Sequence, residues 1–126
     1  LMARTRPLAP HLQVYRPQLT SMMSIAHRAS GIVLTTGTLV LAAWLVALAL
    51  GAESYDLLAG LLAHPLGQFV LFGYSVALIY HALNGLRHLG WDFGYGLTLS
   101  EVYRNGHMVL FLTLVLTAGL WLTVLL

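Results

Sequence analysis

Three long stretches without a charged residue constrain the fold of this chain more than any other feature of its sequence. They cover residues 29–52, 57–86 and 105–126, which are 24, 30 and 22 residues long. An α-helix rises about 1.5 Å per residue, so each stretch exceeds the roughly 20 residues that cross a hydrocarbon core about 30 Å thick. The sequence therefore predicts an all-α integral membrane bundle of three transmembrane helices.

The composition excludes several classes of protein. Only 8% of the 126 residues are charged and 59% are hydrophobic, whereas a soluble domain is about 25% charged. The chain has no cysteine, which excludes a disulfide framework and an iron–sulfur cluster held by its own thiolates. The net charge is only +2 without a basic cluster, so we expect the lipid bilayer as a partner and no nucleic acid.

Turn-forming residues divide the chain into an arm and three spans within a single domain, residues 1–126. Three prolines predict an extended arm over residues 1–20. Thr20 or Ser21 is expected to cap the first helix, and residues 57–62 are expected to form only a short interfacial turn. The predicted spans cover about residues 21–51, 65–91 and 101–126.

The positions of the basic residues predict the orientation of the helices. All six are arginines: four precede the first charge-free stretch, and two lie around the connection between the second and third spans. Basic flanking residues stay on the inner side of the membrane, so we expect the N-terminus inside and the C-terminus outside. No targeting segment is evident before Arg28, which favours a bacterial inner membrane over the mitochondrial inner membrane.

Ionisable side chains within a span are costly and are first considered as functional, and one group of them lies at the start of the first helix. Ser24, His27 and Arg28 stand at positions i, i+3 and i+4, on one helical face. Together they could hydrogen-bond a quinone carbonyl or pair with the carboxylates of a buried cofactor. Alternatively, Arg28 only anchors the helix at the interface while Ser24 bonds to its own backbone.

The second group lies near the end of the second span. His81, Asn84, Gly85 and His88 stand at i, i+3, i+4 and i+7 and form one stripe of polar and small residues. A haem fits this pattern, with His81 as axial ligand and a glycine one turn away that allows the macrocycle to approach the backbone. Alternatively, Gly85 packs against a neighbouring helix and His81 donates to a carbonyl group.

Three segments, which include both groups, resemble one known family. Residues 6–12 (RPLAPHL) resemble its opening RPLSPHL, and residues 21–31 (SMMSIAHRASG) resemble its signature S-x-x-S-I-x-H-R-x-S/T-G. Residues 81–92 (HALNGLRHLGWD) resemble its signature H-x-x-x-G-I/L-R-H-x-x-x-D. The family is the large membrane-anchor (cytochrome b556) subunit of succinate dehydrogenase, the succinate:quinone oxidoreductase of respiratory complex II. Ala9 and Leu86 depart from its common Ser and Ile without removing a charged group.

This resemblance implies specific roles for the residues of the two groups. His81 would be the axial ligand of haem b iron, with the second axial histidine coming from the small membrane-anchor subunit. His27, Arg28 and His88 would lie near the haem propionates. Ser24 and Arg28 would line the site of the substrate ubiquinone.

The resemblance also implies partners: an iron–sulfur subunit and a flavoprotein subunit would dock on the inner side and supply electrons from succinate. The chain would then take part in the enzyme complex without catalysing succinate oxidation itself. Two alternatives remain at this point. One is a small transporter or channel subunit whose polar stripe lines an ion path, and the other is a purely structural anchor.

Overall fold

A computed structural model describes residues 15–126. The described residues form four α-helices, α1 (Leu19–Leu50), α2 (Ala52–Ala63), α3 (Pro65–Asp92) and α4 (Leu99–Leu125), with no strand among them. The all-α prediction is therefore confirmed. The motif at residues 6–12 and most of the predicted arm lie outside the described residues.

Three of these helices are long and apolar enough to cross a membrane, namely α1, α3 and α4. They contain 32, 28 and 27 residues, which corresponds to lengths of about 40–48 Å. The three predicted spans are thus confirmed, and their ends lie within two residues of the predicted positions. The orientation of the termini across the membrane stays a prediction.

The prediction of a short turn at residues 57–62 is wrong, because this segment belongs to the 12-residue helix α2. Gly51 adopts φ +108° between α1 and α2, a conformation that favours glycine and allows the chain to change direction there. Glu53 lies in the first turn of α2, where an acidic side chain interacts favourably with the helix dipole. Pro65 then starts α3, and the His64 side chain accepts a hydrogen bond from the Leu66 amide at 3.2 Å.

The caps of the spanning helices come from residues near their first turns. The expected cap at Thr20 or Ser21 is wrong by two to three residues: α1 is capped by Gln18, and its carbonyl accepts a hydrogen bond from the Ser21 hydroxyl at 3.1 Å. At the start of α4, the Glu101 carboxylate accepts a hydrogen bond from the Thr98 amide at 3.1 Å. The Thr98 hydroxyl in turn accepts a hydrogen bond from the Glu101 amide at 3.4 Å, so this reciprocal capping of α4 satisfies two backbone donors that the helix terminus would otherwise leave unpaired.

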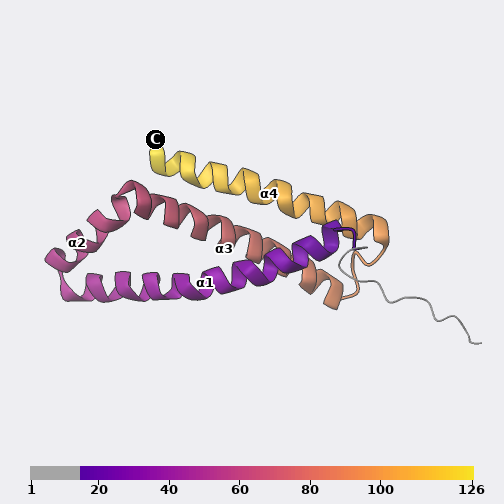
Figure 1. Cartoon of the computed structure of the whole chain (residues 1–126), viewed down its shortest axis with the longest axis horizontal. Coiled ribbons are helices and arrows are strands. Elements are labelled where there is room, and N and C mark those ends of the chain that lie inside the picture. The colour runs from indigo at the N-terminus through magenta and orange to yellow at the C-terminus, as the bar shows by residue number, and fades with distance from the viewer. Residues whose placement is uncertain (1–14) are drawn as a thin grey trace, which may run out of the picture.

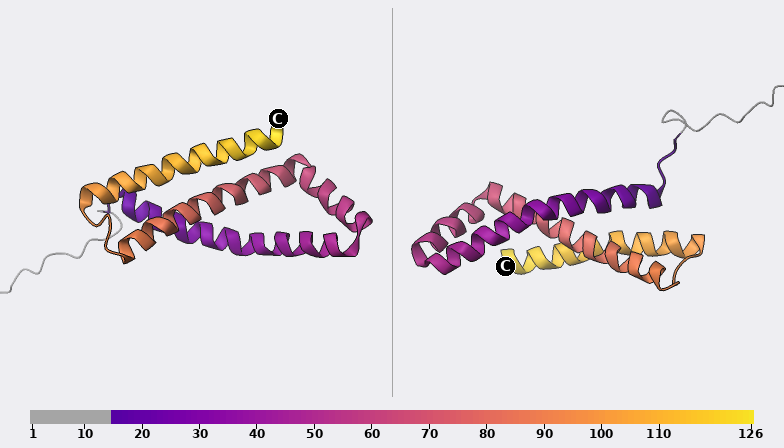
Figure 2. Two further views of the ribbon diagram at one scale, coloured as in Figure 1. Left: turned by 180° about the vertical axis from the view of Figure 1, so that it is seen from behind. Right: turned by 90° about the horizontal axis from the view of Figure 1, so that it is seen from below.

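Figure 1 shows that the start of α1, the end of α3 and the start of α4 lie together, and we call this the polar end of the bundle. Helix α3 packs against both α1 and α4. From the polar end, α1 and α3 diverge towards α2, which joins them at the opposite end (Figure 2). The small core lies at the polar end and is formed by Met23, Tyr80 and Val109.

Candidate functional site

Three of the predicted haem-side residues form one cluster at the polar end. His27 projects from α1 and stacks on His81 of α3, with ring centroids 4.0 Å apart and an interplanar angle of 9°. His88, two turns along α3 from His81, lies 5.3 Å from His27 between ring centroids. All three are half-buried. We refer to His27, His81 and His88 as the histidine cluster.

Hydrogen bonds to α1 fix the ring of His81. Its Nδ1 lies 2.9 Å from the Ser30 hydroxyl and 3.1 Å from the His27 carbonyl oxygen. The Ser30 hydroxyl donates its own proton to the same carbonyl at 2.7 Å. Both oxygens can therefore accept a hydrogen bond from the N–H group at Nδ1, and a neutral imidazole protonated at Nδ1 carries its lone pair on Nε2. This tautomer is the one that binds a metal through Nε2.

Small residues let the two helices approach at this point. A Cβ atom on Gly31 would lie 3.2 Å from Cε1 of His81, and one on Gly85 would lie 4.0 Å from Cε1 of His27. Both features of the packing alternative are present, namely glycines at the helix contact and a histidine bonded to a carbonyl group. They use only Nδ1 of His81, so they are compatible with a ligand role for Nε2.

His88 is held by its own helix rather than by α1. Its Nδ1 lies 2.8 Å from the Asn84 carbonyl oxygen, and its ring packs edge-on against Trp91 at 4.8 Å between centroids. A histidine oriented in this way directs its second nitrogen away from the helix backbone. His88 is thus positioned as a polar group at the border of the cluster.

Ser24 and Arg28 lie on α1 beside the cluster but do not bond to it. Ser24 is half-buried and Arg28 is exposed. The hydrogen bonds of the cluster go to Ser30 and to two backbone carbonyls, and within the described residues none goes to Ser24 or Arg28. These two side chains remain available to a molecule outside the chain.

A second polar network lies on the side of α3 that faces α4. Asn84 is fully buried and accepts a hydrogen bond from Arg87 Nη1 at 3.2 Å, while Arg87 Nη2 donates to the Val102 carbonyl of α4 at 2.9 Å. The Arg87 guanidinium also lies 4.3 Å above the centroid of the Trp91 ring. The Tyr80 hydroxyl donates to the Met23 carbonyl of α1 at 2.7 Å. These contacts tie three helices together behind the histidine cluster.

Comparison with known proteins identifies the family of this chain. Residues 2–120 match the family described as the succinate dehydrogenase/fumarate reductase transmembrane subunit. The chain belongs to this family. The chain is 39% identical to the mitochondrial succinate dehydrogenase cytochrome b560 subunit of Sus scrofa, over 94% of this chain and 72% of the relative.

Bacterial members of the family are equally similar. Succinate dehydrogenase cytochrome b556 subunits of Rickettsia typhi and Paracoccus denitrificans are each 38% identical to this chain. The alignments cover 92% and 83% of this chain and 90% and 81% of the relatives. The predicted family is confirmed, and it places the chain among the membrane subunits of the succinate dehydrogenase enzyme complex. The transporter alternative therefore loses its support.

The sequence patterns did not indicate the contacts of two residues at the polar end of the bundle, Ser30 and Arg87. Ser30 received no role, although it stands three residues after His27 and therefore on the same face of α1. Arg87 was considered only as a basic flanking residue, yet it is 8% exposed and bonds across to α4. Asn84 was assigned to the histidine stripe, but its side chain faces Arg87 instead.

Proposed function

We propose that this chain is a haem b-binding membrane anchor of a succinate:quinone oxidoreductase, with His81 as the axial ligand that it contributes. One observation carries the proposal: hydrogen bonds from Nδ1 to Ser30 and to the His27 carbonyl orient the ring and leave Nε2 to bind iron. The names of the relatives as cytochrome b subunits support it. Haem, when bound, supplies a centre that carries one electron at a time.

The residues around His81 fit such a group. Nδ1 of His27 is buried and has no hydrogen-bond partner among the described residues, and buried polar atoms of this kind normally have one. His27 can donate a hydrogen bond to a propionate, as can Nε2 of His88 when its ring carries both protons, and Arg28 can pair with the propionates' negative charge. Because the three histidines are only half-buried, a second subunit is needed to enclose a macrocycle. We infer that the small membrane-anchor subunit does so and supplies the second axial histidine.

We further propose that Ser24 and Arg28 form this chain's part of the ubiquinone site. They lie one turn apart on α1, and neither is used by the histidine cluster. The Ser24 hydroxyl can donate to one quinone carbonyl oxygen. The Arg28 guanidinium can polarise that carbonyl and stabilise the negative charge that develops on the oxygen during reduction, a case of electrostatic preorganisation.

The partners in this proposal are the small anchor, iron–sulfur and flavoprotein subunits, which together deliver electrons from succinate oxidation in the tricarboxylic acid cycle. The chain's polar end would face the two peripheral subunits. The complex would lie in an inner membrane, which is consistent with mitochondrial and bacterial relatives. Large exposed apolar side chains along all three spanning helices leave ample surface for lipid and for the small anchor subunit.

Two activities of the purified complex test the quinone site. Ser24→Ala should lower succinate:ubiquinone reductase activity several-fold, because a hydrogen bond of this kind contributes about 0.5–1.5 kcal/mol. Succinate oxidation with an artificial acceptor should stay unchanged. Ser100→Ala is the matched control, since Ser100 is an exposed serine at the same end of the bundle. Unchanged succinate:ubiquinone reductase activity in Ser24→Ala would contradict the quinone role, whereas an equal loss of both activities would point to failed assembly instead.

Haem content tests the cofactor independently of activity. The pyridine haemochrome assay on the purified wild-type complex should give one b-type haem for each copy of this chain. A complex that contains all four subunits and no haem would overturn the cofactor proposal while leaving the anchor role intact.

A further inference from the structure

Arg87 is a buried cation whose hydrogen-bond partners are all neutral. It is 8% exposed, and it donates from Nη1 to the Asn84 side-chain oxygen at 3.2 Å and from Nη2 to the Val102 carbonyl oxygen at 2.9 Å. Its remaining contact is with the Met23 sulfur, so within residues 15–126 none of its bonds goes to an acidic side chain. An arginine keeps its proton in proteins. The end of α3 therefore holds an uncompensated positive charge.

The packing around Arg87 keeps anions away from this charge. The guanidinium lies 4.3 Å above the centroid of the Trp91 ring, and its Nε is enclosed by the chain. A carboxylate of another subunit has little access to a group that is covered in this way. Buried arginines are normally paired with an anion, because burying an unpaired charge is costly. What distinguishes Arg87 is thus the lack of a counter-charge.

Asn84 is the residue that leaves this charge uncompensated. It is fully buried, and only its side-chain oxygen is used, because its amide nitrogen has no hydrogen-bond partner in the part of the chain that the structure describes. An aspartate has the same shape, would accept the same hydrogen bond from Arg87 and would lose no other bond. It would also neutralise the arginine. The asparagine therefore keeps the pair positive without gaining a hydrogen bond in return.

The charge lies near the histidine cluster without bonding to it. Asn84 and Arg87 follow His81 by three and six residues, which is about 4.5 and 9 Å along α3. Trp91 lies between the two networks, since Arg87 covers its ring and His88 packs against it at 4.8 Å between centroids. Two unit charges about 10 Å apart, at an effective dielectric constant of about 20, shift an equilibrium about tenfold. Arg87 is therefore close enough to act on the cluster through space.

We propose that the uncompensated charge of Arg87 raises the reduction potential of the haem that His81 binds. This inference rests on the haem proposal above. Adding one electron to a haem lowers the positive charge at its iron by one, and a nearby cation favours that change. Arg87 acts from the side of α3 that faces α4, so it leaves the positions of the propionates and the quinone free. Asn84 contributes by being neutral.

Asn84→Asp is the variant that tests the charge with the least change in structure. It keeps the side-chain shape and the bond to Arg87 but cancels the net charge of the pair. Arg87→Met removes the charge together with the bond to Val102, whereas Arg87→Lys loses the guanidinium and keeps the charge. Gln68→Glu is the matched control, since it makes the same change from amide to carboxylate at an exposed position near the opposite end of α3.

The measurement is a redox titration of the purified complex, followed by the b-type band in the visible spectrum. Asn84→Asp and Arg87→Met should lower the ratio of reduced to oxidised haem at a given potential about tenfold, which corresponds to about 59 mV for one electron. Arg87→Lys and Gln68→Glu should stay close to the wild type. If Asn84→Asp does not assemble, the difference between Arg87→Lys and Arg87→Met decides.

Two results would overturn the role of the charge while leaving the haem proposal intact. One is the same midpoint potential in the wild type, Asn84→Asp and Arg87→Met. The other is an equal decrease in Arg87→Lys and Arg87→Met with no change in Asn84→Asp, which would show that the bonds of the guanidinium matter and its charge does not. A wild-type complex without a b-type band would instead contradict the haem proposal itself, and this inference with it.

Discussion

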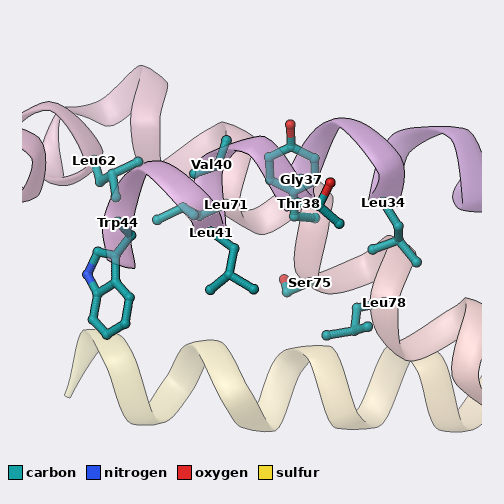
Figure 3. Close-up of a pocket in the computed structure, with 11 residues that line it drawn as sticks. Leu34, Gly37, Thr38, Val40, Leu41, Trp44, Leu62, Leu71, Ser75 and Leu78 are labelled. Carbon is teal, nitrogen blue, oxygen red and sulfur yellow. The ribbon is translucent and has the colours of Figure 1, made fainter. Parts of the chain in front are cut away.

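Helices α1 and α3 face each other in two very different ways along their length. At the polar end they are joined by hydrogen bonds through Ser30, His81 and Tyr80, and glycine brings their surfaces together. Further towards α2 they line an open apolar cavity of about 560 Å³ instead, to which α2 adds Leu62. Figure 3 shows Leu41 and Trp44 of α1 and Leu78 of α3 around this cavity.

The difference teaches what fixes helix positions in a membrane. Apolar contacts contribute little there, because lipid tails are as apolar as leucine, so close packing and interhelical hydrogen bonds determine which helices hold together. The polar end has both, and it holds the candidate site. The apolar half has such a contact at Tyr74, whose hydroxyl bonds to Thr36 at 3.0 Å and whose ring lies 3.1 Å from the Cβ position of Gly37. The cavity extends to both sides of this contact, whereas the polar end adds Ser30, His81 and Tyr80 in succession. We therefore expect the polar end to be the rigid half and the apolar half to tolerate substitutions.

The largest effect should come from enlarging a small residue at the polar end. Gly31→Val forces atoms into the ring of His81, which lies 3.2 Å from the Cβ position, and overpacking of this kind costs about 1–3 kcal/mol. The melting temperature and the haem content of the complex should both fall. Gly73→Val is the control, because nothing lies within 4 Å of its Cβ position. If both variants behave like the wild type, the two halves do not differ in packing.

Filling the cavity should have a smaller effect of the opposite sign. Val40 lines the cavity and is half-buried, so Val40→Phe adds apolar volume where space exists and should stabilise the complex by about 0.5–2 kcal/mol. The measurement is the melting temperature in detergent, with haem content unchanged. A lower melting temperature would show that lipid or a partner side chain already fills this space in the complex.

The smallest effect should come from the hydrogen bond in the apolar half. Thr36→Val removes the hydroxyl that bonds to Tyr74 but keeps the shape of the side chain. Interhelical hydrogen bonds in membranes average about 0.6 kcal/mol, so thermal unfolding should shift only slightly. A shift as large as that of Gly31→Val would mean that this half also has a fixed polar contact on which the bundle depends.

Much of the fold could be predicted because charge is scarce and spans are long. The three spanning helices follow from uninterrupted apolar stretches, because a helix needs about 20 such residues to cross the hydrocarbon core of a membrane. Helix α2 was missed because its 12 residues are too short to span and its apolar run resembles an interfacial turn. Only the structure shows that the left-handed conformation of Gly51 separates it from α1.

The sequence predicted which residues of the candidate site share a face of one helix. It did not predict which residues of two different helices lie in contact. Spacing along one helix placed His81 and His88 on a common side, but it could not show that Ser30 of α1 bonds to His81. For the same reason the sequence did not predict that Arg87 is buried, since this depends on its hydrogen bond to the Val102 carbonyl of α4 as well as on Asn84 of its own helix. Helical periodicity gives a direction for each side chain, whereas its partner depends on how the helices cross.

The central proposal is that His81 is the haem ligand of this chain, and the reduced-minus-oxidised visible spectrum of the purified complex tests it most directly. The comparison uses the wild type, His81→Ala and His107→Ala, since His107 is an exposed histidine on α4. We expect a b-type band in the wild type and in His107→Ala, and a lost or strongly altered band in His81→Ala. An unchanged b-type band in His81→Ala would contradict the proposal.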